Sequence, residues 1–373
     1  MLFLLAACTP EPACTDCDTP EVVVPFTACA VDGAATTLVN VPRNTALPSP
    51  LGFGDHVLVS YEDVAPDGTE SIVGLVNVDA ALTSPQVDAL YTDRELSSNP
   101  VLVPVAGGAM AVWSYQDGLL GLRLDEAGGI LAGPFDLGAG YHHEVAANGA
   151  DGVVIAWTPD NDAPGGVGRW SADGSLLASG ELGPIDALDG IVVVGDETWV
   201  FGFGDEPGLQ FARFDAALQP IDGVMVADEA ITSAHSSTVL SATAAEGRVH
   251  LTVLIEQEIG TYELVRGHLT DTGELEDREQ WNPEGAPFYS ATAFNDGRAE
   301  VTAWSNDEDA IAVRASVASV DGAELLAATD LSDAAVSPRI EAAVAAVEDG
   351  YLVVWRFFDL GANALEARHI ACE

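Results

Sequence analysis

The sequence predicts an all-β fold, a seven-bladed β-propeller of four-stranded blades, and three observations support this prediction. A motif of a glycine, a run of apolar β-formers and a tryptophan recurs, most clearly at Gly108–Trp113, Gly152–Trp157 and Gly350–Trp355. Successive copies end 44 to 52 residues apart, close to the spacing of roughly 40–50 residues expected of propeller blades. The opening segment of the chain also matches a segment inside a later repeat, which indicates a ring closed by both chain ends.

The motif occurs seven times, because looser copies end at Tyr61, Phe203, Leu254 and Trp304. Each copy is followed by a second β-rich run, and several of these runs end in Asp-Gly, Gly-Gly or Thr-Gly, which are strong hairpin signals. Six or eight blades are the nearest alternatives. An array of β-sandwiches is the alternative fold, but sandwiches do not require a whole motif to recur at this period.

The predicted strands follow the same order in every unit, with the motif strand first and its hairpin partner second. They are Asp55–Tyr61 and Ser71–Val78; Ala109–Tyr115 and Leu119–Leu124; Val153–Thr158 and Val167–Ser171; Thr198–Phe203 and Leu209–Phe214; Val249–Ile255 and Tyr262–Leu269; Ala299–Trp304 and Ile311–Ser316; and Tyr351–Phe357 and Leu365–Ala371, preceded in this last unit by Pro338–Ala345. The last unit therefore stops one strand short of a four-stranded blade.

The missing strand is predicted at the start of the chain. Ala28–Val39 resembles Val317–Leu326, the segment that joins the third and fourth strands of the sixth unit, so it can supply the outer strand of the last blade. This closure brings Cys29 and Cys372 together and predicts a disulfide between them, with Cys14 and Cys17 pairing locally. A zinc site would need a second cysteine pair, and a redox Cys-x-x-Cys motif would normally open a helix.

The N-terminus has the composition of an export signal. Residues 1–7 are a short apolar run, too short to span a bilayer, and Leu5–Cys8 resembles the bacterial lipoprotein box, in which the cysteine is lipidated. Residues 8–24 then form a lipidated Cys8 and a flexible tether, and residues 25–373 form a single propeller domain. Thr9 after the cysteine favours the outer membrane of a Gram-negative cell. The alternative is an ordinary signal peptide with an incidental cysteine.

The repeat resembles the blades of uncharacterised secreted lipoproteins from myxobacteria and their relatives. Those repeats carry a Gly-x-Leu-Val-Val-Trp strand followed by an Asp-Gly turn, and the resemblance covers Phe26–Cys372. It implies a propeller at the cell envelope and does not imply an activity. The repeat departs from the Tyr-Trp-Thr-Asp, WD40 and kelch signatures, so the partners of those families are not expected.

The charge balance excludes some partners. The chain has 59 acidic and 13 basic residues, all of the latter arginine, and a formal net charge of −46. Such a charge argues against nucleic acid and anionic lipid as direct partners, and it favours a monomer because copies repel one another. Hydrophobic content of 48% is sufficient for a folded core.

Two groups of residues are candidates for ligand binding. Acidic loops follow the motif strand of several units, and their carboxylates either form a solvated rim or share Ca²⁺, with Asp160, Asp162, Asp307 and Asp309 as the candidate ligands. Trp170 and Trp281 fall outside the motif strands, so they are candidates to stack on a ligand, whereas the tryptophans of the motif itself are expected in the core.

No enzyme motif is found, and the chain has no Gly-x-Ser-x-Gly, His-Glu-x-x-His or Walker loop. The only histidine cluster, His142-His143-Glu144, lies in a predicted innermost strand, where alternation sends the two histidines to opposite faces. We therefore predict a surface-anchored binding or scaffolding module for a protein, a glycan or an envelope component. The alternative is a carbohydrate-active lyase or hydrolase with its site in the funnel of the propeller, and a third possibility is a purely structural envelope protein.

Overall fold

The computed structural model describes most of the chain after the predicted tether. The described residues are 24–41, 48–65, 70–93, 97–116, 118–140, 142–149, 152–158, 165–183, 185–204, 208–234, 236–245, 247–258, 261–281, 287–295, 299–306, 312–319, 322–332, 342–359 and 362–373. These residues form seven antiparallel sheets of four strands each, as the sequence predicts.

The sheets of blades 1 to 4 are each formed by four consecutive strands. Blade 1 contains β2 (Ser49–Phe53), β3 (His56–Val64), β4 (Ser71–Asp79) and β5 (Gln86–Asp93); blade 2 contains β6 (Ser97–Val105), β7 (Gly108–Tyr115), β8 (Gly118–Leu124) and β9 (Ile130–Ala139); blade 3 contains β10 (His142–Ala147), β11 (Gly152–Thr158), β12 (Gly166–Ser171) and β13 (Leu176–Glu181); blade 4 contains β14 (Ile185–Val194), β15 (Glu197–Gly204), β16 (Gln210–Phe214) and β17 (Pro220–Met225).

Blades 5 and 6 follow the same pattern, and blade 7 combines strands from both ends of the chain. Blade 5 contains β18 (Ser236–Ala245), β19 (Arg248–Glu258), β20 (Thr261–Leu269) and β21 (Leu275–Trp281); blade 6 contains β22 (Pro287–Asn295), β23 (Ala299–Asn306), β24 (Val313–Ser319) and β25 (Glu324–Asp330); blade 7 contains β26 (Ala342–Val347), β27 (Gly350–Asp359), β28 (Ala362–Cys372) and β1 (Cys29–Val41). The short helix α1 (Glu229–Thr232) follows blade 4. Among the residues that the structure describes, no helix is long and apolar enough to cross a membrane.

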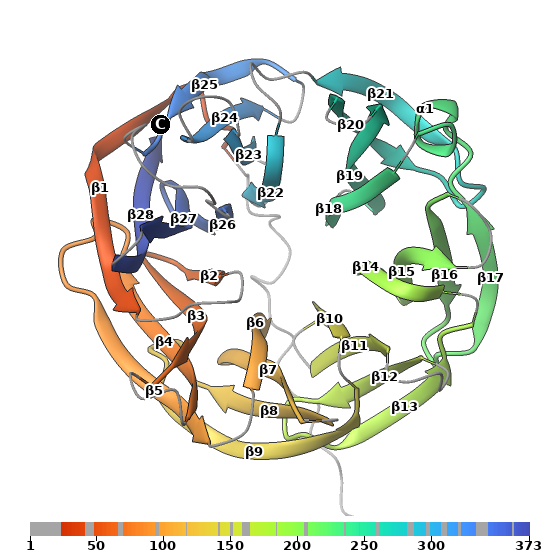
Figure 1. The fold of residues 1–373 in the computed structure, drawn as a ribbon, viewed down its shortest axis with the longest axis horizontal. Coiled ribbons are helices and arrows are strands. Elements are labelled where there is room, and N and C mark those ends of the chain that lie inside the picture. Colours follow the sequence, from red (N-terminus) through yellow and green to blue (C-terminus); the bar gives the residue numbers. More distant parts are fainter. Residues whose placement is uncertain are drawn as a thin grey trace, which may run out of the picture.

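The blades form a closed ring, with the first strand of each sheet at the centre and the fourth at the perimeter (Figure 1). Because neighbouring strands are antiparallel, the connections between second and third strands all emerge on one face, which we call the loop face. The hairpin turns between first and second strands, and between third and fourth strands, emerge on the opposite face, which we call the turn face.

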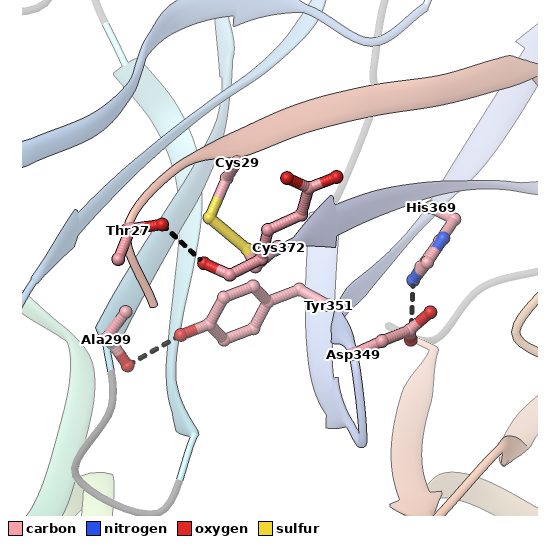
Figure 2. Close-up of a disulfide and its surroundings, with 8 residues drawn as sticks. Thr27, Cys29, Ala299, Asp349, Tyr351, His369 and Cys372 are labelled. Atoms are coloured by element: carbon pink, nitrogen blue, oxygen red, sulfur yellow. Dashed lines mark hydrogen bonds and ion pairs between the residues drawn. A yellow bond between two sulfur atoms is a disulfide. The ribbon is translucent and has the colours of Figure 1, made fainter. Parts of the chain in front are cut away.

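Both ends of the chain meet in blade 7, as the sequence predicts. The β1 strand pairs antiparallel with β28, and Cys29 lies opposite Cys372 and forms a disulfide with it (Figure 2). The main chain adds two hydrogen bonds beside the disulfide, from Thr27 N to Glu373 O (2.6 Å) and from Glu373 N to Ala28 O (2.9 Å). Because Cys372 ends the third strand of its blade, the predicted tether joins the ring on the turn face.

Tyr351, from the motif strand of blade 7, shows how the repeat holds neighbouring blades together. Its ring is fully buried, and its hydroxyl donates a hydrogen bond of 2.6 Å to Ala299 O in blade 6 (Figure 2). The motif tryptophans Trp113, Trp304 and Trp355 are also fully buried. The prediction that the motif supplies the core is therefore confirmed for these residues.

Six of the seven seams between neighbouring blades contain a cluster of buried apolar side chains. These clusters join blades 1 and 2, 2 and 3, 3 and 4, 4 and 5, 6 and 7, and 7 and 1. The seventh seam, between blades 5 and 6, involves β22, whose side chains are not among those described.

Charged and hydrogen-bonding side chains occupy the seam between blades 5 and 6. Arg266 of β20 forms an ion pair with Glu279 (2.8 Å), lies 3.7 Å from Glu300 of blade 6, and donates a hydrogen bond of 3.3 Å to the hydroxyl of Thr302. Burial raises the pKa of Glu300, and the positive charge of Arg266 opposes that shift. Arg266 therefore stabilises the charged form of a carboxylate that burial disfavours.

We expect Arg266→Met to lower the unfolding free energy at pH 7 by about 2 kcal/mol, because it leaves a half-buried carboxylate without its positive partner. The midpoint of urea unfolding measures this change. Adding Glu300→Gln to Arg266→Met removes the stranded charge and should recover at least half of the loss. A single variant with the wild-type midpoint would show that the ion pairs of this seam contribute nothing to the ring.

Candidate functional site

Most of the acidic loop residues that the sequence singles out lie outside the described residues. This applies to the four candidate calcium ligands, Asp160, Asp162, Asp307 and Asp309, and also to the N-terminal cysteines Cys8, Cys14 and Cys17. No group of three or more His, Cys, Asp or Glu side chains suited to a metal is found in the part of the chain that the structure describes. The calcium prediction therefore stays a prediction.

The acidic pair that directly follows the motif residue Tyr61 belongs to a strand and not to a loop. The β3 strand extends to Val64, so it includes Glu62 and Asp63. The Glu62 side chain is only 3% exposed, and Asp63 accepts a hydrogen bond from Val64 N (2.7 Å). In blade 1 these carboxylates are therefore part of the sheet, and Glu62 does not belong to a solvated rim.

The two tryptophans predicted to contact a ligand have different environments. Trp170 of β12 is 3% exposed and packs in the apolar seam between blades 2 and 3. A Cβ added to Gly168 would lie 2.3 Å from the Trp170 ring, so this glycine leaves room for the ring against the sheet. Trp170 has no exposed face for stacking and is a core residue. Trp281 ends β21, and its side chain is not among those described.

The arginines that recur in the third strands support neighbouring segments. Arg213 forms ion pairs with Glu197 (3.0 Å) and Asp222 (3.2 Å), and its guanidinium lies 4.9 Å from the centre of the Trp199 ring. Arg123 instead donates to the backbone oxygen of Ala106 (3.1 Å). Arg213 thus pairs with carboxylates, whereas Arg123 binds a turn.

The His142–Glu144 cluster lies on β10, the innermost strand of blade 3, as predicted. Alternation along the strand separates its members, because His142 is exposed and His143 is 7% exposed opposite Trp157. Glu144 lies on the same side of β10 as Ala146, which packs in the seam toward blade 4. The carboxylate of Glu144 therefore faces the next blade along the wall of the channel.

Asp189 of blade 4 is the acidic partner of Glu144. It lies on the innermost strand β14, at an irregularity between Leu188 and Gly190 where the register with β15 shifts. Its carboxylate accepts a hydrogen bond of 2.5 Å from Val239 N, which itself lies beside an irregularity in β18 of blade 5. Bulges leave main-chain groups unpaired within a sheet. Here the Asp189 carboxylate accepts a hydrogen bond from such a main-chain group, and this bond links blade 4 to blade 5.

A similar connection is found between blades 1 and 2. Ser49 Oγ accepts a hydrogen bond from Leu102 N (3.0 Å), and Ser60 Oγ donates one to Pro100 O (2.9 Å), next to a register shift in β6. Side chains that bind the irregular parts of innermost strands are thus a structural feature of this ring. Asp189 differs from the two serines because it carries a charge that interacts with a second carboxylate.

The environment favours the protonated forms of both acids. Burial and, to a smaller extent, the nearby charge of Asp189 raise the pKa of Glu144 from 4.5 to about 7. Burial also raises the pKa of Asp189 to about 6, and the hydrogen bond from Val239 opposes this shift. Near neutral pH these two acids can therefore hold a proton, which is the property required of a general acid.

The sequence pointed to one member of this pair. Glu144 was noticed because of the neighbouring histidines, while Asp189 was not singled out. A signal was available, since Asp189 and Asp186 are the only charged residues in the otherwise apolar strand Ile185–Val194. The proximity of Asp189 to Glu144 of blade 3 could not be predicted, because it depends on the closed ring.

Comparisons with known proteins identify a fold and no family. No family model matches the chain, and no curated protein matches it. Among solved structures, the chain is similar to a puromycin hydrolase, with a TM-score of 0.53 and 15% identity over 91% of this chain and 55% of the hydrolase. A mutant of the hydrolase complexed with PGG gives a TM-score of 0.52 and 15% identity, covering 84% of this chain and 50% of that one.

A propeller of nearly equal length is also similar, the Dos1 propeller, with a TM-score of 0.48 and 8% identity over 92% of this chain and 94% of that one. The chain spans about half the length of the hydrolase that it matches. At these identities the likeness concerns the fold alone. The closed ring of seven four-stranded sheets defines the class of the protein as a seven-bladed β-propeller.

Proposed function

We propose that this protein is an exported, lipid-anchored propeller that serves as a binding or scaffolding module at the cell envelope. The observation that supports this best is the disulfide between Cys29 and Cys372, which closes the ring through its two chain ends. Disulfides persist mainly in oxidising compartments outside the cytosol. A covalently closed ring also presents its surfaces in a fixed geometry, which lowers the entropic cost of binding a partner.

The site of anchoring is proposed from the sequence. Cys8 would carry the lipid, and residues 8–24 would form the tether. The lipid alone would attach the protein to the membrane, which we propose to be the outer membrane of the cell envelope. The partner would be a protein, a glycan or an envelope component bridged by cations. With a net charge of −46, nucleic acid is not expected as a partner, and the protein itself is expected to be monomeric.

Metabolic labelling with a palmitate analogue tests the anchor in a Gram-negative host. The wild-type chain should incorporate the label and sediment with the outer membrane, while Cys8→Ser should lose the label and appear in the soluble periplasmic fraction. Cys14→Ser is the matched control and should keep the label. A wild-type chain without label would overturn the lipoprotein proposal.

The acidic loops are tested by the melting temperature in EDTA, Mg²⁺ and Ca²⁺ at matched ionic strength. We expect Mg²⁺ and Ca²⁺ to give the same melting temperature, because at matched ionic strength the self-repulsion of a chain with a net charge of −46 is screened equally. A rise of several degrees that only Ca²⁺ produces would instead show built calcium sites, since a ligand that binds the native state raises its stability.

A carbohydrate-active lyase or hydrolase is the second candidate, and the Glu144–Asp189 pair favours it. Two carboxyl groups with raised pKa values on a channel wall are the kind of pair that glycoside cleavage can use. Reducing-sugar assays on a panel of polysaccharides test this candidate. Activity of the wild type that is lost in Glu144→Gln would establish the enzyme. The absence of activity on every polysaccharide of the panel would contradict the enzyme and retain the binding module as the proposed function.

A further inference from the structure

A row of aliphatic side chains lies exposed along the outer edge of the ring. Its members are the first or second residues of the outermost strands β9, β13 and β17, and each is between 45% and 57% exposed: Ile130, Leu131, Leu176, Leu177 and Ile221. We call these five residues the rim row. The three strands follow one another along the perimeter (Figure 1), and the rim row lies at their turn-face ends.

Contacts between successive blades join the strands that carry the rim row. The turn of blade 3 packs on β9, since a Cβ added to Gly174 would lie 2.4 Å from the ring of Phe135. The turn of blade 4 packs on β13 in the same way, since a Cβ added to Gly180 would lie 2.5 Å from Leu218 O. The outermost strands β9 and β13 are therefore each in contact with the turn of the next blade, and the rim row is distributed along these joined strands.

Blade 5 shows what happens when such a position is covered. Leu275 follows its hairpin turn as Leu176 does, and both turns have the same two main-chain hydrogen bonds. Leu275 is only half-exposed, because it packs against the cluster that contains Val226 and Ile231, from the segment after blade 4. That segment also donates a hydrogen bond from Ala227 N to Gly273 O (2.6 Å). A segment of chain that packs on the turn and bonds to its main chain is therefore the kind of occupant that this position accepts.

The charges around the rim row define the chemistry of its partner. Exposed carboxylates flank the aliphatic residues, namely Glu126, Asp136, Asp173 and Glu181. A second copy of this chain is a poor partner, because it carries the same net charge of −46. Aliphatic side chains combined with lysine or arginine would match both the apolar surface and its acidic surroundings.

The edge of β13 is the most open of the three. Within the described residues, no strand pairs with its outer side, and its sequence from Leu176 to Glu181 contains neither proline nor a basic residue. Its neighbours are better protected, because β9 contains Pro134 and β17 begins at Pro220. Natural proteins usually shield a free edge with such residues, and an unshielded edge can pair with a strand of another chain.

We propose that the rim row is a docking surface for an extended, cationic segment of another protein, which pairs with the edge of β13 and covers the aliphatic residues on either side. This assignment rests on the binding function proposed above and specifies its partner class and surface.

Fluorescence anisotropy with a labelled octapeptide of alternating lysine and valine tests the proposal on the full-length protein. We expect saturable binding, and we expect Leu176→Ser with Leu177→Ser to weaken it by about tenfold or more, because two exposed leucines no longer contribute apolar contact. Val24→Ser is the matched control, since Val24 is an exposed aliphatic residue (68%) outside the rim row. Melting temperatures confirm that both variants are folded.

Three outcomes would overturn the proposal: equal binding of the leucine variant, equal binding of a lysine–serine octapeptide, or binding to phosphatidylcholine vesicles in place of the lysine–valine octapeptide. The first two would show attraction by charge alone, and the third would show a membrane-facing surface. Failure of the anchor proposal is distinguishable, because a protein that binds the octapeptide through the rim row but lacks the palmitate label contradicts only the proposed location.

Discussion

Replacing both Cys29 and Cys372 by serine is expected to lower the unfolding free energy by about 3–5 kcal/mol and the melting temperature by roughly 5 °C. The two cysteines are separated by 343 residues, so the disulfide restricts almost the whole unfolded chain. In the folded protein the same residues lie opposite one another in the β1–β28 ladder, and the variant keeps the hydrogen bonds beside them. The loss is therefore expected to come mainly from the greater freedom of the unfolded chain.

Reduction provides the first check on this prediction. A reducing agent should bring the melting temperature of the wild type down to that of the double variant, and it should leave the double variant unchanged. Cys14→Ser with Cys17→Ser removes as many cysteines from the predicted tether and should have little effect. If the Cys29 and Cys372 variant has the same melting temperature as the wild type, pairing of β1 with β28 alone is sufficient to close the ring.

The arrangement of blades could be predicted because each blade repeats the same local signals. A glycine, an apolar strand and a hairpin turn specify two strands without any long-range information. Ring closure could be predicted because the last unit contains only three strands. Ala28–Val39, near the start of the chain, resembles the segment that leads into the fourth strand of the sixth unit. For the same reason, the pairing of Cys29 with Cys372 was available from the sequence, although 343 positions separate them.

Trp170 shows where local signals were insufficient. Its place outside the motif strand suggested exposure, yet the space above Gly168 allows its ring to lie in the seam between blades 2 and 3. The sequence shows the glycine two positions earlier, but only the packing of two blades shows that both residues share a buried face. Position in the repeat is thus a weaker guide to burial than the pairing of small and large residues.

The channel pair was beyond prediction for a different reason. Glu144 and Asp189 belong to different blades, and they interact because adjacent innermost strands line one channel. The irregularity at Asp189 also breaks the alternation from which a face could be assigned. The ion pairs of Arg266 at the seam between blades 5 and 6 are similar, because Arg266, Glu279 and Glu300 come from three strands of two blades.

Replacing Glu144 by glutamine is expected to stabilise the protein by roughly 2–3 kcal/mol above pH 7 and to have little effect below pH 4.5. The folded pKa of Glu144, about 7, exceeds its ordinary value of 4.5. As pH rises between these values, the unfolded chain releases the proton while the folded protein keeps it, so the wild type loses stability. Glutamine holds no titrating proton and avoids this loss. Urea unfolding from pH 4 to pH 8 measures the difference.

Glu181→Gln is the matched control, because it removes the same charge from an exposed position at the perimeter. Its difference from the wild type should stay within about 0.5 kcal/mol at every pH. A Glu144→Gln variant whose difference from the wild type is equally independent of pH would show that Glu144 titrates as an ordinary carboxyl group.

Asp189→Asn separates the two causes of the Glu144 shift. Burial is the larger cause and remains in this variant, whereas the charge of Asp189 is removed. The pKa of Glu144, followed by the carbon NMR signal of its carboxyl group, should therefore fall while staying above 4.5. Such a fall would show that the two acids titrate as a coupled pair, as an acid–base site in the channel requires. An unchanged pKa would assign the shift to burial alone and remove the observation that favours an enzyme.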